Sequence, residues 1–233
     1  MATSDALQYP GRDLEAMSFA VNYHRWIIGE LASYLGGSTA EVGAGVGSVS
    51  KLLLEHPIDR LVAYEPSKNL FPLLVDALRN EPRATAINDF FRADSSDQFD
   101  SIAYINVLEH VEDDAAEIAA AYRALKRGGH LLLFVPALMA LYSELDRQIG
   151  HFRRYRRSAL RRIVEHAGFS VVRCRYFDVV GIAPWYVNFV VLKNAMTSRG
   201  VTLYDKLVVP VMRRIESSIP PPIGKNVLLV ARK

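Results

Sequence analysis

Short apolar runs alternate with amphipathic segments through the middle of the chain. Apolar runs typical of buried strands fall at residues 39–45 with their turn, 60–66, 83–88, 99–107 and 130–136. Helical patterns fall between them at residues 48–56, 67–80 and 113–129, and glycines close the last of these helices. Strands buried on both faces read as near-continuous apolar runs. The pattern therefore predicts an α/β fold with a doubly wound, mostly parallel sheet.

The pattern becomes irregular after Pro136. The elements expected from there on are a helix at 158–168, a strand at 170–177, an apolar segment at 179–196, an amphipathic segment at 202–219 and a last strand at 226–233. The stretch after Pro136 is too polar and irregular for a core strand, and Gly181 and Pro184 interrupt the apolar segment. The two stretches in question are residues 137–155 and 178–223. We interpret both stretches as cap insertions in a single domain that spans residues 1–233.

The composition is that of one globular domain. Half of the 233 residues are hydrophobic and 23% are charged, which excludes disordered, collagen-like and coiled-coil classes. Cys174 is the only cysteine, so no internal disulfide forms. The N-terminus lacks a basic and then apolar leader pattern, and no run reaches about 18 apolar residues. We expect a cytoplasmic protein.

A glycine-rich turn follows the first predicted strand. Gly43, Gly45 and Gly47 alternate with other residues, and Glu41 comes two positions before the first of them. Glycines allow a tight turn and let a ligand approach the backbone at the carboxyl edge of the sheet. The dinucleotide fingerprint requires glycine where this chain has Ser48, and Glu41 repels a pyrophosphate but attracts a cation. The motif favours a positively charged nucleoside such as S-adenosylmethionine over NAD.

Acidic residues also follow the next two predicted strands. Glu65 ends the second strand, 18 residues after Gly47, where a carboxylate accepts hydrogen bonds from both ribose hydroxyls. Asp89 follows the third strand and, with Phe90, offers adenine one hydrogen bond and one ring contact. The alternatives are a solvated loop glutamate and an ordinary Asp-rich turn. Three acids after three consecutive strands favour the nucleoside site.

Together these residues resemble the class I S-adenosylmethionine-dependent methyltransferases, and the resemblance covers nearly the whole chain. The similar motifs are the glycine turn at 41–47, the acid at Glu65, the Asp89–Phe90 pair, the fourth-strand motif at 105–114 and the helix-to-strand signature at 126–136. The resemblance implies a seven-stranded Rossmann-like methyltransferase fold with an antiparallel last strand. It also implies S-adenosylmethionine as cofactor, S-adenosylhomocysteine as product and cofactor contacts from Pro66 and Asn106.

The resemblance also assigns parts of the chain to functions. Residues 1–37 correspond to an N-terminal helical lid, in which Tyr23 and Trp26 are candidates to contact the cofactor, and residues 38–136 to the cofactor-binding half. The alternative for both aromatic residues is packing of the helix onto the sheet. The downstream part is similar to a bacterial subgroup of small-molecule methyltransferases. That subgroup has Asn where this chain has Asp178.

Methyl transfer requires the acceptor atom to be aligned with the methyl group and shielded from water. His110, after the fourth predicted strand, and His151, in the first insertion, are candidate general bases, with Tyr155 beside His151. Asp146 and Tyr142 are candidates to orient His151. The alternatives are helix capping or cofactor contact for His110 and a structural tie for His151. No HxxxH motif or cysteine cluster is present, so we expect no metal site.

The charges are divided between the two halves of the chain. Residues 1–140 carry a net charge of −8 and residues 141–233 a net charge of +11. The basic run at 151–162 suggests RNA, but the acidic first half opposes a long polyanion, and one small anion needs only two or three arginines. The apolar run at 179–192 is too short to span a bilayer. It is suited to an acceptor pocket, a dimer surface, peripheral membrane contact or plain lid packing.

We therefore predict methyl transfer to an oxygen or nitrogen atom of a small metabolite that is anionic, glycosylated or lipid-linked. Nucleic acid is not the expected partner. The alternatives are an RNA or protein methyltransferase and a catalytically silent methyltransferase-like interaction domain.

Overall fold

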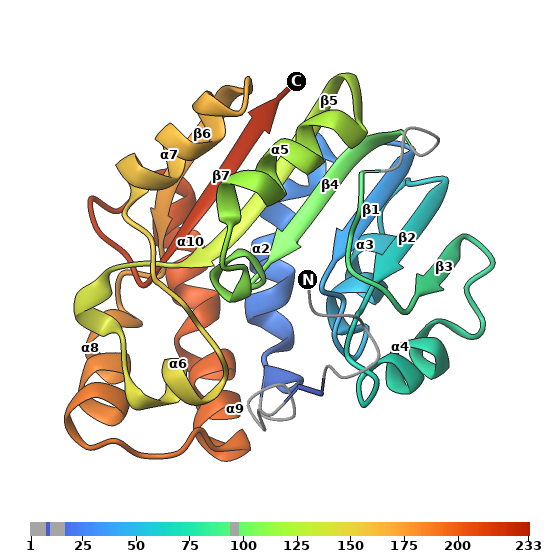
Figure 1. Cartoon of the computed structure of the whole chain (residues 1–233). Helices are drawn as coiled ribbons and strands as arrows, with labels where there is room; N and C mark the ends of the chain where they lie inside the picture. The colour runs from blue at the N-terminus through green and yellow to red at the C-terminus, as the bar shows by residue number, and fades with distance from the viewer. Residues whose placement is uncertain (1–7, 10–16, 94–97) are drawn as a thin grey trace.

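The computed structural model describes residues 8–9, 17–93 and 98–233. Its centre is a seven-stranded sheet with the order β3-β2-β1-β4-β5-β7-β6 (Figure 1). Strands β1 to β5 are parallel, and β7 is antiparallel to both of its neighbours. The predicted fold class, with its antiparallel last strand, is therefore confirmed. The strands are β1 (Ser38–Val42), β2 (Arg60–Tyr64), β3 (Ala84–Ile87), β4 (Phe99–Ile105), β5 (Leu125–Pro136), β6 (Ser170–Phe177) and β7 (Asn226–Arg232).

Helices cover both faces of this sheet (Figure 1). Alternate residues of β4 point to opposite faces, so Ile102 and Tyr104 pack with helices α5 and α7, whereas Ala103 packs with α2 and α10. The helices are α2 (Val21–Leu31), α3 (Ser48–Leu54), α4 (Phe71–Leu78), α5 (Asp114–Ala124), α6 (Glu144–Gln148), α7 (Arg157–His166), α8 (Ile182–Trp185), α9 (Ser198–Leu207) and α10 (Val209–Ser218). No helix in the described ranges is long and apolar enough to cross a membrane.

Two stretches depart from the predicted elements, and in each a particular residue gives the reason. The helix expected to end at Gly128–Gly129 ends instead at Ala124, and both glycines lie in β5. Gly128 has φ +83°, and a Cβ on Gly129 would lie 3.0 Å from the Asp100 carbonyl oxygen, so the glycines form an irregularity in the sheet. The amphipathic segment at 202–219 divides into α9 and α10 because Pro210 starts a new helix.

The first predicted cap insertion and the α8 to α9 part of the second gather near the carboxyl ends of β4 and β5, whereas α10 of the second packs on the sheet beside α2 (Figure 1). The first contains the short 3-10 helix η4 (Met139–Leu141) and α6, and the second contains α8, the π-helix η5 (Tyr186–Val191), α9 and α10. The Trp185 indole N–H donates to the Leu141 carbonyl at 3.0 Å, which ties the second insertion to the first. The division into lid, cofactor-binding half and caps stays a prediction.

Candidate functional site

The glycine turn at the end of β1 depends on backbone conformations that favour glycine. Gly43, Gly45 and Gly47 have φ values of +70°, +57° and +83°. A Cβ on Gly43 would lie 2.6 Å from the Val107 side chain. The backbone can therefore approach both β4 and a ligand closely only because these positions lack side chains.

Glu41 supplies a buried carboxylate directly before this turn. It is 2% exposed, lines a cavity at the carboxyl edge of the sheet and accepts a hydrogen bond from the Ser50 hydroxyl. Burial raises the pKa of Glu41 to about 8, because a charged carboxylate is costly there and none of the described residues pairs it with a cation. A positively charged ligand in the cavity would favour the carboxylate form.

Glu65 ties the end of β2 to the glycine turn. Its carboxylate accepts from the backbone N–H of Gly45 at 2.7 Å and of Ser67 at 2.8 Å. Pro66 is the residue between Glu65 and Ser67 in the chain. Asp89 accepts from the Phe90 N–H at 2.8 Å and from Arg92 at 3.2 Å. In the part of the chain that the structure describes, none of Glu65, Pro66, Asp89 and Phe90 lines the cavity of Glu41.

We call this cavity the glycine-turn cavity. It measures 180 Å³, and its walls include Gly43, Gly45 and Asn106. Asn106 is the first residue after β4 and has a positive φ of +55°. Gly47 is not among the described lining residues; it ends the turn, where a Cβ would lie 2.9 Å from the Cβ of Ala77. The lining also includes Tyr9, Met17, Tyr23, Glu109, His110, His151, Arg154, Trp185 and Lys225.

The two aromatic lid candidates lie in different surroundings. Tyr23 is buried but lines the cavity, and its hydroxyl donates to the Asn226 side chain at 3.0 Å. Trp26 is 1% exposed, and its ring lies 3.9 Å from the Phe177 ring between α2 and the sheet. The packing alternative therefore describes Trp26, whose side chain is enclosed by the core and does not reach the cavity.

The described N-terminal segment, residues 8–9, lines the cavity through Tyr9, which the sequence reasoning did not single out. The Tyr9 N–H donates to the Asn69 side chain at 2.9 Å, and the Asn69 amide donates back to the Tyr9 carbonyl at 3.1 Å. Asn69 follows β2, so these bonds hold the segment beside the predicted nucleoside site.

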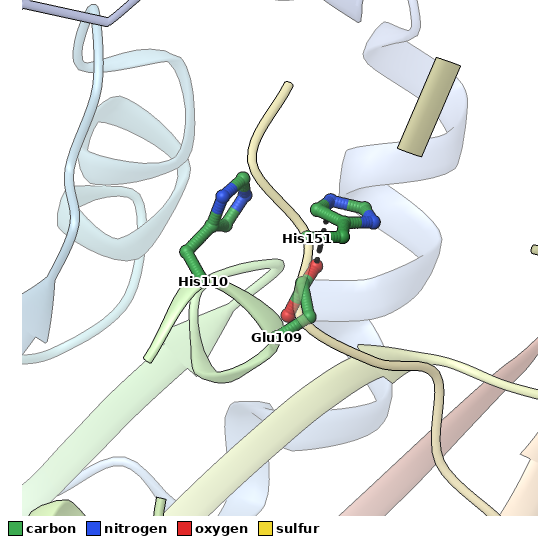
Figure 2. Close-up of side chains that lie close together, drawn as sticks. All are labelled: Glu109, His110 and His151. Atoms are coloured by element: carbon green, nitrogen blue, oxygen red, sulfur yellow. Dashed lines mark ion pairs between the residues drawn. The ribbon is translucent and has the colours of Figure 1, made fainter. Parts of the chain in front are cut away.

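Three polar side chains meet in the wall of the cavity: Glu109, His110 and His151 (Figure 2). Glu109 and His110 lie in the 3-10 helix η3 (Leu108–His110), and His151 follows α6. The His110 and His151 rings are 4.6 Å apart and nearly perpendicular. Burial and the neighbouring His151 lower the pKa of His110 to about 3, so its imidazole is neutral.

Asp146 orients His151, as its position in the sequence suggested. Its carboxylate lies 2.8 Å from Nδ1 of His151 and accepts two hydrogen bonds from Arg154, at 2.8 and 3.0 Å. Tyr142 acts on the backbone, since its hydroxyl donates to the His151 carbonyl at 2.7 Å. Burial opposes ionisation of Asp146, but hydrogen bonding from His151 and the charge of Arg154 outweigh it and lower its pKa.

Tyr155 lies behind this wall. Its hydroxyl is 2.8 Å from the Asp114 carboxylate and 3.2 Å from the Leu108 carbonyl, and burial with Asp114 raises its pKa. It is 3% exposed and is absent from the described cavity lining. In this geometry Tyr155 supports η3, and its candidate role in catalysis stays a prediction.

A second, larger cavity of 490 Å³ adjoins the first, and we call it the cap cavity. The two share Met17, Tyr23, Trp185, Met196 and Lys225. The surface that lines the cap cavity as a whole is mainly apolar, with Ala20, Pro184, Phe189 and Val201 among its residues, although Asn188, Asn194 and Asp205 also line it.

Lys225 stands where the two cavities meet. Its ammonium lies 2.8 Å from the Asp178 carboxylate and 4.9 Å from the centre of the Tyr23 ring. Asp178 is fully buried, has φ +61° and accepts from the Tyr204 hydroxyl. Asp178, which stands where the similar bacterial subgroup has Asn, thus supplies Lys225 with a counter-ion. Lys225 was not predicted, because nothing near it in the sequence marks it as functional.

The glycine-turn cavity fits a cationic nucleoside such as S-adenosylmethionine. The turn packs so closely against Val107 that Gly43 has no room for a Cβ, and Glu41 offers a buried carboxylate without a cationic partner among the described residues. Both features are suited to a ligand that carries an ammonium and a sulfonium group.

Comparisons with known proteins agree with this geometry. A comparison with curated proteins found no match. Among solved structures, an S-adenosylmethionine-dependent methyltransferase from Mesorhizobium loti is 15% identical with a TM-score of 0.58, covering 96% of this chain and 100% of that one. Haemonchus contortus phosphoethanolamine N-methyltransferase 2, in complex with S-adenosyl-L-methionine, is 15% identical with a TM-score of 0.61, covering 93% and 56%.

Magnesium protoporphyrin IX methyltransferase from Synechocystis PCC 6803, with bound S-adenosylhomocysteine, is also 15% identical; its TM-score is 0.56, and 94% and 84% of the two chains are covered. At these identities the likeness concerns the fold. The sequence itself matches the family described as methyltransferase domain over residues 30–173. This match spans more than half of the chain, and the protein therefore belongs to the methyltransferase domain family.

Proposed function

We propose that the protein transfers a methyl group from S-adenosylmethionine to an oxygen or nitrogen atom of a small, lipid-linked acceptor, with S-adenosylhomocysteine as product. One observation carries the proposal. The cavity that contains Glu41 and the glycine turn shares Tyr23, Trp185 and Lys225 with a larger apolar cavity. One cavity suits a cationic nucleoside and the other an apolar acceptor, so the two reactants would meet at the shared wall.

The residues at the glycine turn would divide the cofactor between them. Glu41 faces the amino group, because it is the buried acid of the cavity. Glu65 receives the ribose hydroxyls, since each of its oxygens keeps a lone pair beyond its backbone hydrogen bond. Asp89 and Phe90 follow β3 and take the adenine side. Tyr9 covers this end through its bonds to Asn69.

S-adenosylmethionine, when bound, supplies a methyl group whose bond to sulfur breaks with the electron pair left on sulfur. The acceptor atom forms the new bond to carbon and must lose a proton if it is a hydroxyl or an ammonium. His110 and His151 line the cavity, and neutral His110 has a lone pair for that proton. Tyr155 holds the Leu108 carbonyl and acts as a positioning residue.

The cap cavity supports an acceptor with an apolar body over a strongly anionic one. Its lining is mainly apolar, and the charge of Lys225 is already matched by Asp178 at 2.8 Å. Lys225 can still donate a hydrogen bond to a carbonyl or phosphate oxygen at the head of the acceptor. Among the anionic, glycosylated and lipid-linked acceptors, these contacts favour the lipid-linked class.

An exposed apolar stripe on α9 and α10 supports the same class. Its members are spaced four residues apart along α9, α10 and the residue after α10, and each is at least half exposed: Leu203, Leu207, Val211, Ile215 and Ile219. The helices also carry Arg199, Lys206, Arg213 and Arg214. Since α9 also lines the cap cavity, a bilayer with anionic lipids that touched this stripe would lie next to the acceptor site.

The RNA alternative has less support, because internal contacts occupy several arginines of the basic run. Arg154 is buried against Asp146, and Arg153 pairs with Asp114 at 2.8 Å. Arg161 pairs with Glu165 on the same helix. These guanidinium groups are held by protein partners in place of a phosphate backbone.

Calorimetric titration with S-adenosylhomocysteine tests the cofactor half of the proposal. We expect one ligand per chain at micromolar concentration. Incubation with tritium-labelled S-adenosylmethionine and a total lipid extract of the source organism should then move label into the organic phase. Label that enters only a water-soluble extract contradicts the lipid-linked acceptor. A folded protein that does not bind at millimolar ligand contradicts the whole proposal.

A further inference from the structure

Glu109 is an unusual carboxylate for a protein interior. It is 0% exposed, and neither of its carboxylate oxygens has a hydrogen-bond partner among the described residues. Buried polar groups are almost always hydrogen-bonded, and an unpartnered buried carboxylate is costly. Its nearest cationic candidate is His151, whose Nε2 lies 3.8 Å from Oε1, too far for a hydrogen bond. Both carboxylate oxygens of Glu109 are therefore acceptors without a donor among the described residues.

One imidazole nitrogen of His110 and one of His151 lie close to the Glu109 carboxylate (Figure 2). One ligand atom from each of Glu109, His110 and His151 lies within 4.8 Å of the other two. The carboxylate of Asp146 contacts Nδ1 of His151 at 2.8 Å. A carboxylate accepts only, so Nδ1 of His151 donates this hydrogen bond and Nε2 is the ring nitrogen that faces Glu109. A carboxylate behind a histidine is the arrangement that orients metal-binding imidazoles in proteins.

We infer that Glu109, His110 and His151 bind a divalent transition-metal ion of the zinc, cobalt or manganese type. Two imidazoles and one carboxylate favour these ions over Mg²⁺ and Ca²⁺, which prefer oxygen ligands. Three protein ligands leave at least one coordination position open. The sequence reasoning expected no metal site, because His110 and His151 are far apart in the chain and match no metal-binding spacing.

The site requires a modest contraction on binding. Ligands about 2.0–2.1 Å from a tetrahedral ion lie about 3.4 Å from one another. The observed separations of up to 4.8 Å must therefore shorten by about 1.4 Å at most. Rotation of the Glu109 side chain toward the histidines can supply this movement, since no hydrogen bond among described residues holds its carboxylate.

The open position would face the glycine-turn cavity, which all three ligands line. This part of the inference rests on the proposed function. An acceptor hydroxyl bound there would lose its proton at a lower pH, and the resulting oxygen would attack the methyl carbon while the sulfur keeps its electron pair. The proton would leave to solvent. His110 and His151 would then act as ligands rather than as general bases.

Cobalt binding tests the site without any assay of methyl transfer. The full, untagged chain is stripped with a chelator and titrated with Co²⁺, and the visible absorption of the bound ion is followed together with calorimetry. We expect one Co²⁺ per chain in the micromolar range or tighter, displaced by Zn²⁺. Glu109→Gln and His151→Ala should each weaken binding by more than about 100-fold, because losing a ligand exceeds the 10–100-fold cost of losing a ligand's support.

His166→Ala is the matched control, since His166 is exposed on α7 outside the cluster, and it should bind Co²⁺ like the wild type. S-adenosylhomocysteine binding by Glu109→Gln shows that this variant is folded. Absence of stoichiometric Co²⁺ binding by the wild type, or its retention in both ligand variants, overturns the inference. Co²⁺ binding by a chain that does not bind S-adenosylhomocysteine would instead count against the proposed function alone.

Discussion

Glu41 shows how one residue can couple protonation to cofactor binding. Burial raises its pKa to about 8, so in the free protein the group is mostly neutral at pH 6 to 7. A ligand ammonium beside it favours the ionised form, and binding must therefore release a proton below pH 8. Affinity for the cofactor should consequently rise with pH in this range, by no more than tenfold per pH unit for one group.

Glu41→Gln should abolish this dependence. We expect the wild-type affinity for S-adenosylhomocysteine to increase about tenfold from pH 6 to pH 7.5, and the affinity of the variant to be weak and nearly constant. Calorimetry at each pH measures both, and the ligand amine titrates equally in the two experiments. Glu117→Gln is the control, because burial also raises the pKa of Glu117. Its carboxylate accepts a hydrogen bond from the Tyr104 hydroxyl and is not among the described lining residues of the cavity. A pH-independent wild type would show that Glu41 does not meet the ammonium.

Sequence reasoning found residues of the site where the chemistry is local in the chain. Glu41, Gly43 and Gly45 lie within five positions, and their spacing alone suggested a cationic ligand. Lys225 could not be found in this way, because it reaches the cavity from the far end of the chain. The two oxygens of Glu109 were also missed, since their lack of partners exists only after the fold has enclosed them.

At the scale of elements, apolar runs located the strands because burial on both faces leaves little room for polar residues. The same reasoning failed at Gly128, which is equally suited to a helix cap and to a strand irregularity; only its backbone hydrogen bond with Lys233, just after β7, decides between them. The N-terminal segment is another case. Its hold on the cavity depends on Tyr9 and Asn69, which are 60 residues apart.

Releasing this segment should weaken cofactor binding without unfolding the protein. Asn69→Ala removes both hydrogen bonds to Tyr9, each of which contributes about 0.5–1.5 kcal/mol at most at an exposed site. We expect about 3- to 10-fold weaker S-adenosylhomocysteine binding, mainly through faster dissociation in stopped-flow experiments, and an unchanged melting temperature. Asn80→Ala, an exposed change just after α4, should have no effect. Equal dissociation rates for both variants would show that Tyr9 does not cover the bound ligand.

At the scale of the whole molecule, charge and apolar surface coincide. The first 140 residues carry a net charge of −8 and the rest +11, and the exposed stripe of α9 and α10 lies in the basic part. Apolar side chains at a membrane surface contribute through burial, and each basic residue near anionic lipid contributes about 1 kcal/mol. The sequence predicted a basic, amphipathic segment here. It could not show that the apolar side faces outward, because the helix pattern is the same for a helix that packs inward.

Vesicle binding measures this surface directly. We expect the protein to sediment with vesicles of phosphatidylglycerol and phosphatidylcholine, and salt to weaken the binding because the basic residues act through screened charges. Arg213→Gln with Arg214→Gln should weaken it by about 2 kcal/mol, or roughly 30-fold. Leu207→Glu with Ile215→Glu should weaken it further, because a charge enters the apolar side of the stripe. Val172→Glu is the matched control: Val172 is 51% exposed, but it lies on β6, outside the stripe. If Val172→Glu lowers binding as much as the stripe variants do, or if the wild type remains in solution with anionic vesicles, the acceptor must reach the cap cavity from water and not from a membrane.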